Sequence, residues 1–143
     1  EGLPYYPYDP AARVGGRVRS TDLQRHEIPT SGEGTFTFQR FARVDFGLGD
    51  RNGSLELYWL ESYGGGLFLP FRDDTSGAST YGAGRYLLDS AKGADLGMDG
   101  DDLVLDFNFA YNPSCSYDPQ WVCPLAPPPN RLQMAIEAGE RTR

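Results

Sequence analysis

Glycine and proline are spread along the whole chain, and their distribution limits what this sequence can fold into. The 143 residues contain 18 glycines and 11 prolines. No window of a dozen residues places apolar side chains at helical spacing without including one of them. Glycine destabilises the interior of an α-helix through backbone entropy, and proline does so through its missing N–H. The sequence therefore predicts little helix.

Alternating apolar and polar residues predict a β-hairpin in the first half of the chain. Apolar residues alternate with polar ones along much of 35–46 and 54–61, a period typical of half-buried strands. The stretch between them ends in Asn52-Gly53, a dipeptide preferred in tight hairpin turns. We predict that Asn52-Gly53 forms the turn and that five side chains face the core: Phe36, Phe38, Leu55, Leu57 and Trp59.

Shorter apolar runs predict further strands, at 67–71, 86–89, 103–109 and 131–136, with weaker candidates at 13–19 and 25–28. Six to eight short strands separated by turns are typical of an antiparallel β-barrel or sandwich. With 39% hydrophobic residues the chain can bury one core. We therefore predict an all-β fold with long irregular loops and a single domain over residues 1–143.

Charge and hydropathy exclude several classes of partner. The 13 basic and 20 acidic residues give a net charge of -7, which repels phosphate backbones and argues against nucleic-acid binding. No apolar run approaches the roughly 18 residues of a membrane span, so a soluble protein is predicted. The first residues lack the features of a secretory signal, which favours the cytoplasm, although removal of an upstream signal would mean export. The sequence leaves the oligomeric state open.

The candidate ligand-binding residues lie in two polar stretches. Residues 71–87 combine arginines and aspartates with hydroxyls and glycines, and residues 106–115 place Asp106 and Asn108 on the strand face opposite Phe107 and Phe109. The candidates are Arg72, Asp73, Thr80, Tyr81, Arg85, Asp106, Asn108, Tyr111 and Asn112.

These residues admit a structural and a functional interpretation. In the first, bidentate ion pairs hold the loops against the sheet: Arg72 pairs with Asp73 or Asp74, and Arg85 pairs with Asp106. For Arg85, Asp73 or Asp74 is the second choice. In the second, Arg72 and Arg85 clamp a carboxylate or phosphate, polar neighbours orient it, and Asp106 tunes charge or acts as a base. A shared, solvent-reachable cavity would favour binding, whereas burial and mutual satisfaction would favour the structural interpretation.

Three hypotheses for function follow, and none is established by the sequence. The leading one is a domain that binds a small anionic or hydroxylated molecule. The second is a structural or protein-interaction module with an aromatic surface formed by Tyr5, Tyr6, Tyr8 and Trp121. The third is a hydrolytic or redox enzyme that uses Asp106 or the cysteine pair. Serine hydrolysis is disfavoured because the single histidine, His26, lies in a weakly patterned region.

Cys115 and Cys123 have three interpretations. A disulfide would close a short loop and stabilise it, while two thiols packed as small apolar side chains would suit a reducing compartment. Tetrahedral zinc needs two further ligands, and no histidine lies nearby in the sequence. We therefore predict no metal site and no cofactor, and keep the disulfide as the leading candidate.

Several separate motifs resemble an uncharacterised family of bacteria and archaea, the domain-of-unknown-function family 1684. Their order and spacing are specific, and the similarity runs from Gly2-Leu3 and Tyr5-Tyr6-Pro7 to Glu140. The motifs are Gly66-Leu67-Phe68-Leu69-Pro70-Phe71-Arg72-Asp73, Thr75-Ser76-Gly77, Thr80-Tyr81-Gly82-Ala83-Gly84-Arg85-Tyr86-Leu87, Asp106-Phe107-Asn108, Ala110-Tyr111-Asn112-Pro113, Cys115, Cys123-Pro124, Asn130-Arg131-Leu132 and Ala138-Gly139-Glu140.

The resemblance implies membership without mechanism. The family extends further upstream, so an N-terminal part is expected to precede residue 1. No activity, cofactor or catalytic residue is established for the family, and the resemblance therefore assigns none here.

Overall fold

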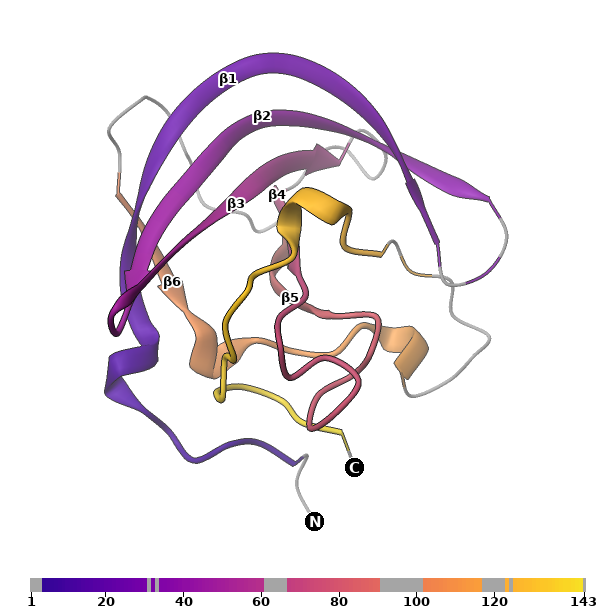
Figure 1. Ribbon diagram of the computed structural model, residues 1–143. Coiled ribbons are helices and arrows are strands. Elements are labelled where there is room, and N and C mark those ends of the chain that lie inside the picture. The colour runs from indigo at the N-terminus through magenta and orange to yellow at the C-terminus, as the bar shows by residue number, and fades with distance from the viewer. Residues whose placement is uncertain are drawn as a thin grey trace.

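One antiparallel sheet of six strands forms the body of the protein and curls into a half-barrel (Figure 1). The computed structural model describes residues 4–30, 32, 34–60, 67–90, 102–116, 123 and 125–142. Across the sheet the strands run in the order β5-β4-β3-β2-β1-β6. They are β1 (Arg13–Pro29), β2 (Thr35–Leu48), β3 (Arg51–Leu60), β4 (Leu67–Phe71), β5 (Arg85–Ser90) and β6 (Asp102–Asp106).

The predicted fold class, antiparallel β with little helix, is confirmed. In the described ranges the helical segments are short 3-10 turns: η1 (Pro10–Ala12), η2 (Phe107–Phe109), η3 (Ser114–Ser116) and η4 (Pro128–Asn130). None of the helical segments that can be described is long and apolar enough to cross a membrane.

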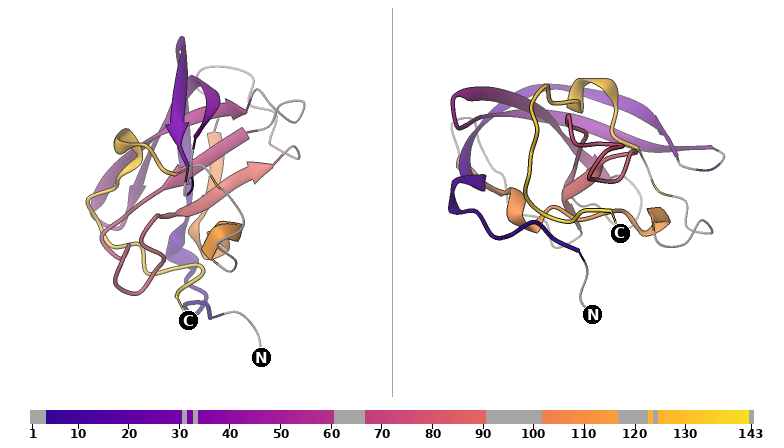
Figure 2. Two further views of the ribbon diagram at one scale, coloured as in Figure 1. Left: turned by 90° about the vertical axis from the view of Figure 1, so that its right-hand side faces the viewer. Right: turned by 60° about the horizontal axis from the view of Figure 1, so that its bottom comes forward.

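β1 and β2 are long and arch over the rest of the molecule (Figure 2). β1 contains both of the weaker strand candidates, 13–19 and 25–28, in one element of 17 residues. β6 pairs with its first part, Arg13 to Arg17, and β2 pairs along most of its length. The chain beyond β6 and η2 also reaches β5, because Tyr86 of β5 exchanges backbone hydrogen bonds of 2.8 and 3.0 Å with Tyr111.

The predicted hairpin forms, but its turn lies earlier than expected. Leu48 pairs with Arg51, so the turn is Gly49-Asp50, and Asn52 and Gly53 lie within β3 opposite Gly47 and Phe46. Gly49 has φ +63°, a conformation that glycine adopts without strain. A Cβ atom on Gly53 would lie 2.6 Å from the Phe46 ring, so this glycine serves close packing.

The hairpin side chains divide between two cores. Leu55 and Leu57 are fully buried in the larger cluster, while Phe38 and Tyr58 are buried in a smaller one. Leu57 and Tyr58 are consecutive and point to opposite faces, so the buried face of the sheet changes between them. The change coincides with a register shift between Arg40 and Ala42.

This change of face explains why the prediction for Trp59 is wrong. Trp59 shares the face of Leu57, but the larger core ends there, and the indole remains 46% exposed. It lies edge-on to Phe41, the additional residue at the register shift, with 6.3 Å between ring centroids.

Two other predicted strands differ from the structure. β6 ends at Asp106, whose carboxylate accepts a hydrogen bond from the Asn108 backbone N–H and begins η2, so Phe109 turns outward and is 68% exposed. The C-terminal segment, residues 130–140, forms isolated bridges rather than a strand of the sheet. Its predicted apolar face is confirmed, since three of its side chains are buried: Leu132, Met134 and Ile136.

Candidate functional site

Arg85 and Asp73 form a buried ion pair between β5 and the residues that follow β4. Their side chains are 1% and 0% exposed, and Nη2 of Arg85 lies 3.6 Å from Oδ2 of Asp73. The guanidinium also lies over the Phe71 ring, 5.1 Å from its centroid. Burial lowers the pKa of the Arg85 guanidinium, and the charge of Asp73 opposes that change. The structure thus selects Asp73, the second-choice partner, over Asp106.

The side chains of this pair form hydrogen bonds with the backbone of the C-terminal segment, as a neighbouring strand otherwise would. Arg85 donates hydrogen bonds to the carbonyls of Ala138, Ile136 at 3.0 Å and Glu140 at 3.2 Å. Oδ2 of Asp73 accepts the backbone N–H of Ile136 at 2.6 Å. The carbonyls belong to alternate residues of an extended chain, as a strand would present them. Arg85 therefore has a structural task that uses most of its donors.

The loop between β4 and β5 is organised around the same carboxylate. Oδ1 of Asp73 accepts the Thr75 hydroxyl at 2.8 Å and the Ser76 hydroxyl at 3.3 Å. Thr75 in turn contacts the hydroxyl of Thr80 at 2.8 Å, and Thr80 is fully buried. Among the candidates, Asp73, Thr80 and Arg85 are thus brought together, but away from solvent.

Asp106 and Asn108 hold the N-terminal segment. The Asn108 amide donates to Oδ1 of Asp106 at 2.8 Å and to the carbonyl of Asp9 at 2.9 Å, and it accepts the Asp9 N–H. Asp106 lies 3.9 Å from the Nε of Arg13. The two side chains therefore meet as predicted, although through the turn η2 rather than on one strand face.

Tyr111 and Asn112 lie beyond η2, where the chain forms an isolated bridge with β5. The Tyr111 ring packs edge-on against Tyr86, with centroids 5.8 Å apart. Asn112 is 8% exposed, and its backbone N–H donates to the buried carboxylate of Glu140 at 2.8 Å. The contacts of both residues favour the structural interpretation.

Arg72 lies at the end of β4 and is half-buried, and no hydrogen-bond partner is seen for its Nε atom in the described ranges. Its backbone pairs with the C-terminal segment, donating to the Asn130 carbonyl at 3.0 Å and accepting from Leu132 at 2.7 Å. Arg72 and Arg85 therefore belong to different environments, and the structure does not place them on one ligand site.

Tyr81 and Cys115 form a small polar contact beside the loop. The Tyr81 hydroxyl lies 3.7 Å from the Cys115 sulfur. Cys115 and Cys123 are both buried and are not joined in a disulfide in this structure. The disulfide stays a prediction, which thiol counting on unfolded, non-reduced protein will test. Among the described residues no three metal-ligating side chains gather at one point.

The Tyr81 contact predicts a pH dependence of stability. Burial raises the pKa of Tyr81 to about 12, and the Cys115 hydrogen bond adds to this. Between pH 10, where an unfolded tyrosine ionises, and pH 12 the folded state holds the proton and the unfolded state does not. The free energy of unfolding should therefore fall as pH rises through this window. Urea unfolding should show a shallower fall for Tyr81→Phe, and an unchanged slope would contradict the assignment.

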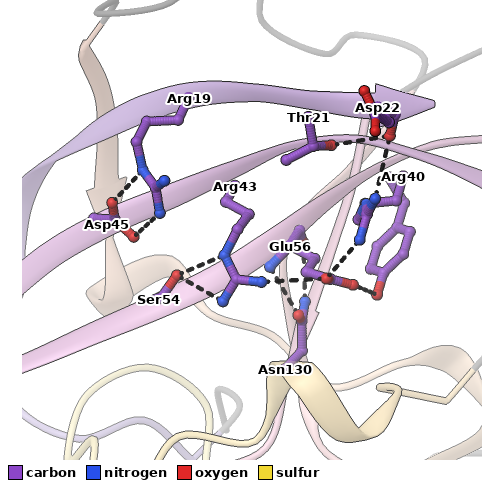
Figure 3. A network of polar contacts seen from close by, with 10 residues as sticks. Arg19, Thr21, Asp22, Arg40, Arg43, Asp45, Ser54, Glu56 and Asn130 are labelled. Atoms are coloured by element: carbon purple, nitrogen blue, oxygen red, sulfur yellow. Dashed lines mark hydrogen bonds and ion pairs between the residues drawn. The ribbon is translucent and has the colours of Figure 1, made fainter. Parts of the chain in front are cut away.

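A second buried polar cluster lies on β1, β2 and β3 and was not anticipated from the sequence (Figure 3). Glu56 is 4% exposed and accepts hydrogen bonds from Tyr58 at 2.7 Å, Arg43 at 3.3 Å and Arg40 at 3.4 Å. Burial and the Glu56 carboxylate raise the pKa of Tyr58. The sequence feature that could have indicated this cluster is a single acid between Leu55 and Leu57, opposite the strand that contains Arg40 and Arg43. Both arginines contact the same carboxylate, that of Glu56.

Asn130 joins this cluster to the C-terminal segment (Figure 3). Its side-chain oxygen accepts the Glu56 N–H at 2.8 Å, and its amide donates to the carbonyls of Glu56 at 3.0 Å and Pro70 at 2.8 Å. Pro70 has no N–H for a ladder with β3, and β3 and β4 pair only at Tyr58–Phe68 and Trp59–Leu67. The Asn130 amide therefore fills the gap between the two strands.

Three clefts surround the end of the β2–β3 hairpin in the described part of the chain. Their volumes are about 360, 590 and 590 Å³. None of the candidate residues predicted from the sequence lines any of them. The smallest has acidic walls that include Asp9, Asp50 and Glu137, and one of the larger two lies beside Arg17 and Asp45.

The third, which we call the Arg51–Arg131 cleft, is the most polar. It lies between residues 50–54 of the hairpin and residues 131–134 of the C-terminal segment, and its polar walls comprise Asp50, Arg51, Asn52, Ser54, Arg131 and Gln133. Arg51 spans it, donating from Nη1 to the Gln133 carbonyl at 3.1 Å. Arg131 is 46% exposed and lies 3.8 Å from Asp74. Exposed guanidinium donors thus line the cleft from both sides.

Sequence reasoning did not select these lining residues. Arg131 belongs to the motif Asn130-Arg131-Leu132, and Arg51 lies in a polar stretch between two predicted strands. The sequence did not indicate that the two residues are close in space. Their proximity depends on the path of the C-terminal segment, which the Arg85–Asp73 pair and Asn130 determine. A local pattern carries no signal for such a contact.

Comparisons with known proteins identify a sequence family that matches the chain and a solved structure with a similar fold. The model of the family described as "Protein of unknown function (DUF1684)" matches residues 1–141. The solution NMR structure of an uncharacterised protein of Haloarcula marismortui is 37% identical, with a TM-score of 0.75. That match covers 99% of this chain and 77% of the archaeal one. No curated protein matches the chain, and neither description names an activity.

Proposed function

Since the chain belongs to DUF1684, a family of proteins of unknown function, we propose that it acts as a binding domain for a small anionic or hydroxylated molecule in the Arg51–Arg131 cleft. The cleft is open to solvent and has a volume of about 590 Å³, within the range of small-molecule sites. Its walls belong to the hairpin and to the C-terminal segment, both held by buried hydrogen bonds.

The pair of arginines carries this proposal. Arg51 and Arg131 outnumber Asp50, so the lining bears net positive charge on a molecule of net charge -7. A guanidinium presents N–H groups that match the oxygens of a carboxylate or phosphate. The side chains of Asn52 and Gln133 are exposed and add neutral donors and acceptors for hydroxyl groups.

The proposal moves the ligand away from the nine candidate residues predicted from the sequence. Arg85 is 1% exposed and is used by three carbonyls and one carboxylate. A ligand that displaced those contacts would leave buried backbone groups unpaired, which costs about 1 to 3 kcal/mol for each group. Hydrolytic or redox chemistry at Asp106 or the cysteines stays a hypothesis without a supporting contact.

Isothermal titration with inorganic phosphate, citrate and glucose tests the proposal. We expect an anion to bind and Arg51→Gln or Arg131→Gln to weaken it about tenfold or more, as loss of a charged hydrogen bond implies. The affinity should also fall as salt rises. A ligand that is hydroxylated but neutral would appear as glucose binding.

Arg25→Gln is the matched control, because it removes the same charge from an exposed residue of β1 that lines none of the three clefts. Its effect on affinity should stay within about twofold, the size of a screened long-range charge effect. Equal losses in all three variants would show a general charge effect and contradict the proposal, and so would the absence of binding to every probe.

A further inference from the structure

We propose that Asp74 is an internal competitor for the ligand of the Arg51–Arg131 cleft, and that the ligand binds Arg131 through a carboxylate or phosphate group that takes the place of the Asp74 carboxylate. This inference rests on the proposed function and names the chemical class of the ligand. Its starting point is the 3.8 Å contact between Oδ1 of Asp74 and Nη2 of Arg131.

The backbone holds Asp74 beside the cleft wall. Residues 72–74 run along the C-terminal segment, with Asp74 N–H donating to the Met134 carbonyl at 3.0 Å. Arg72 and Arg131 form a parallel bridge, so side chains at alternate positions share one side of this layer. Asp73 and Leu132 point into the core, whereas Asp74, Arg131 and Gln133 are exposed.

The ion pair between Asp74 and Arg131 is weak enough for a ligand to displace the Asp74 carboxylate. Asp74 and Arg131 are 52% and 46% exposed, and their separation exceeds hydrogen-bonding distance. Exposed ion pairs of this kind contribute little to stability. The adjacent Asp73, by contrast, is fully buried and accepts hydrogen bonds from three groups. Asp74 is therefore free to leave Arg131, while Asp73 is not free to leave Arg85.

The chemistry of the internal partner identifies the ligand group. Arg131 already accommodates a carboxylate at the edge of the cleft, and a ligand carboxylate or phosphate presents oxygens of the same kind to the same donors. A neutral hydroxyl group does not compete with a carboxylate for a guanidinium to the same degree. Asp74 thus sets the affinity for anions and disfavours neutral ligands at this position.

A double-mutant cycle tests the competition. Inorganic phosphate and citrate are titrated into wild type, Asp74→Asn, Arg131→Gln and the double variant. Asp74→Asn should raise affinity by about two- to fivefold, the factor that an exposed ion pair represents. In the Arg131→Gln background the same change should have less than about a twofold effect, because the competition acts only through Arg131. Asp22→Asn removes an equal charge from exposed β1 and should leave affinity near wild type.

The outcomes separate the inference from the proposed function. Anion binding by wild type with no gain in Asp74→Asn, or an equal gain in Asp22→Asn, overturns the competition and leaves the binding proposal standing. Anion binding by wild type that strengthens in Asp74→Asn, but not in Asp22→Asn, supports both. Failure of both anions to bind any of the four proteins overturns both.

Discussion

Replacement of Arg85 by alanine is expected to lower the free energy of unfolding by about 3 to 5 kcal/mol, the cost of removing one partner of a buried ion pair. The change leaves the Asp73 carboxylate fully buried without its cation and releases the carbonyls of Ile136, Ala138 and Glu140. Arg85→Lys should also destabilise the protein, since a single ammonium cannot reproduce the guanidinium fork. Urea unfolding followed by circular dichroism measures both changes.

Two further variants separate lost pairing from lost volume. Arg85→Met keeps an extended side chain and should still destabilise the protein strongly. Adding Asp73→Asn to it should cost less than the sum of the single changes, because the two residues are in contact. Arg131→Ala, which breaks only the exposed pair with Asp74, should remain within about 1 kcal/mol of wild type. Additive effects at Arg85 and Asp73 would contradict the assigned pair.

Asn130→Ala is expected to cost about 3 kcal/mol or more, because each buried polar group left unpaired costs about 1 to 3 kcal/mol. Three such groups lose their partner: the N–H and carbonyl of Glu56 and the carbonyl of Pro70. The same site lies between β3 and β4, where no backbone N–H of Pro70 is available to compensate. Chemical unfolding of the purified variant gives the difference.

Asn130→Asp provides a test that a simple loss of volume does not mimic. An ionised carboxylate would face two carbonyl oxygens and destabilise the fold, whereas the protonated acid can donate a hydrogen bond. Its folded-state pKa should therefore rise, and the lost stability should return as pH falls below that value. As a control, Asn52→Ala, at an exposed position of the β2–β3 hairpin, should change stability by no more than about 0.5 kcal/mol. An Asn130→Asp variant as stable as wild type at neutral pH would contradict the bridge.

The strands were predictable where local pattern and tertiary packing agree. Phe38, Leu55 and Leu57 follow the alternation and are buried. Trp59 does not, because the register shift between Arg40 and Ala42 moves the core to the other face. The sequence marks that position only as a break in the alternation at Arg40 and Phe41. The turn was misplaced for a similar reason: both Gly49 and Asn52-Gly53 suit a turn, and the Phe46 ring over Gly53 decides between them.

The sequence indicated the buried ion pair of Arg85 but not the Arg51–Arg131 cleft. The motif residues indicated that Arg85 would meet a carboxylate, and Asp73 is that partner. Asp106 was preferred because a continuous strand through Asn108 was assumed, whereas the Asp106 side chain ends the strand by capping η2. The Arg51–Arg131 cleft depends on two segments far apart in the sequence, and only the folded C-terminal segment brings them together.

The central claim is that ligand binds in the Arg51–Arg131 cleft and not at the ligand-binding candidates predicted from the sequence, and an NMR titration tests it directly. Amide chemical shifts of the labelled protein are followed as inorganic phosphate is added at constant ionic strength. We expect the largest saturable changes at residues 50–54 and 131–134, the two walls of the Arg51–Arg131 cleft. Saturable changes centred on residues 72–85 or 106–112, with none at the hairpin, would contradict the account.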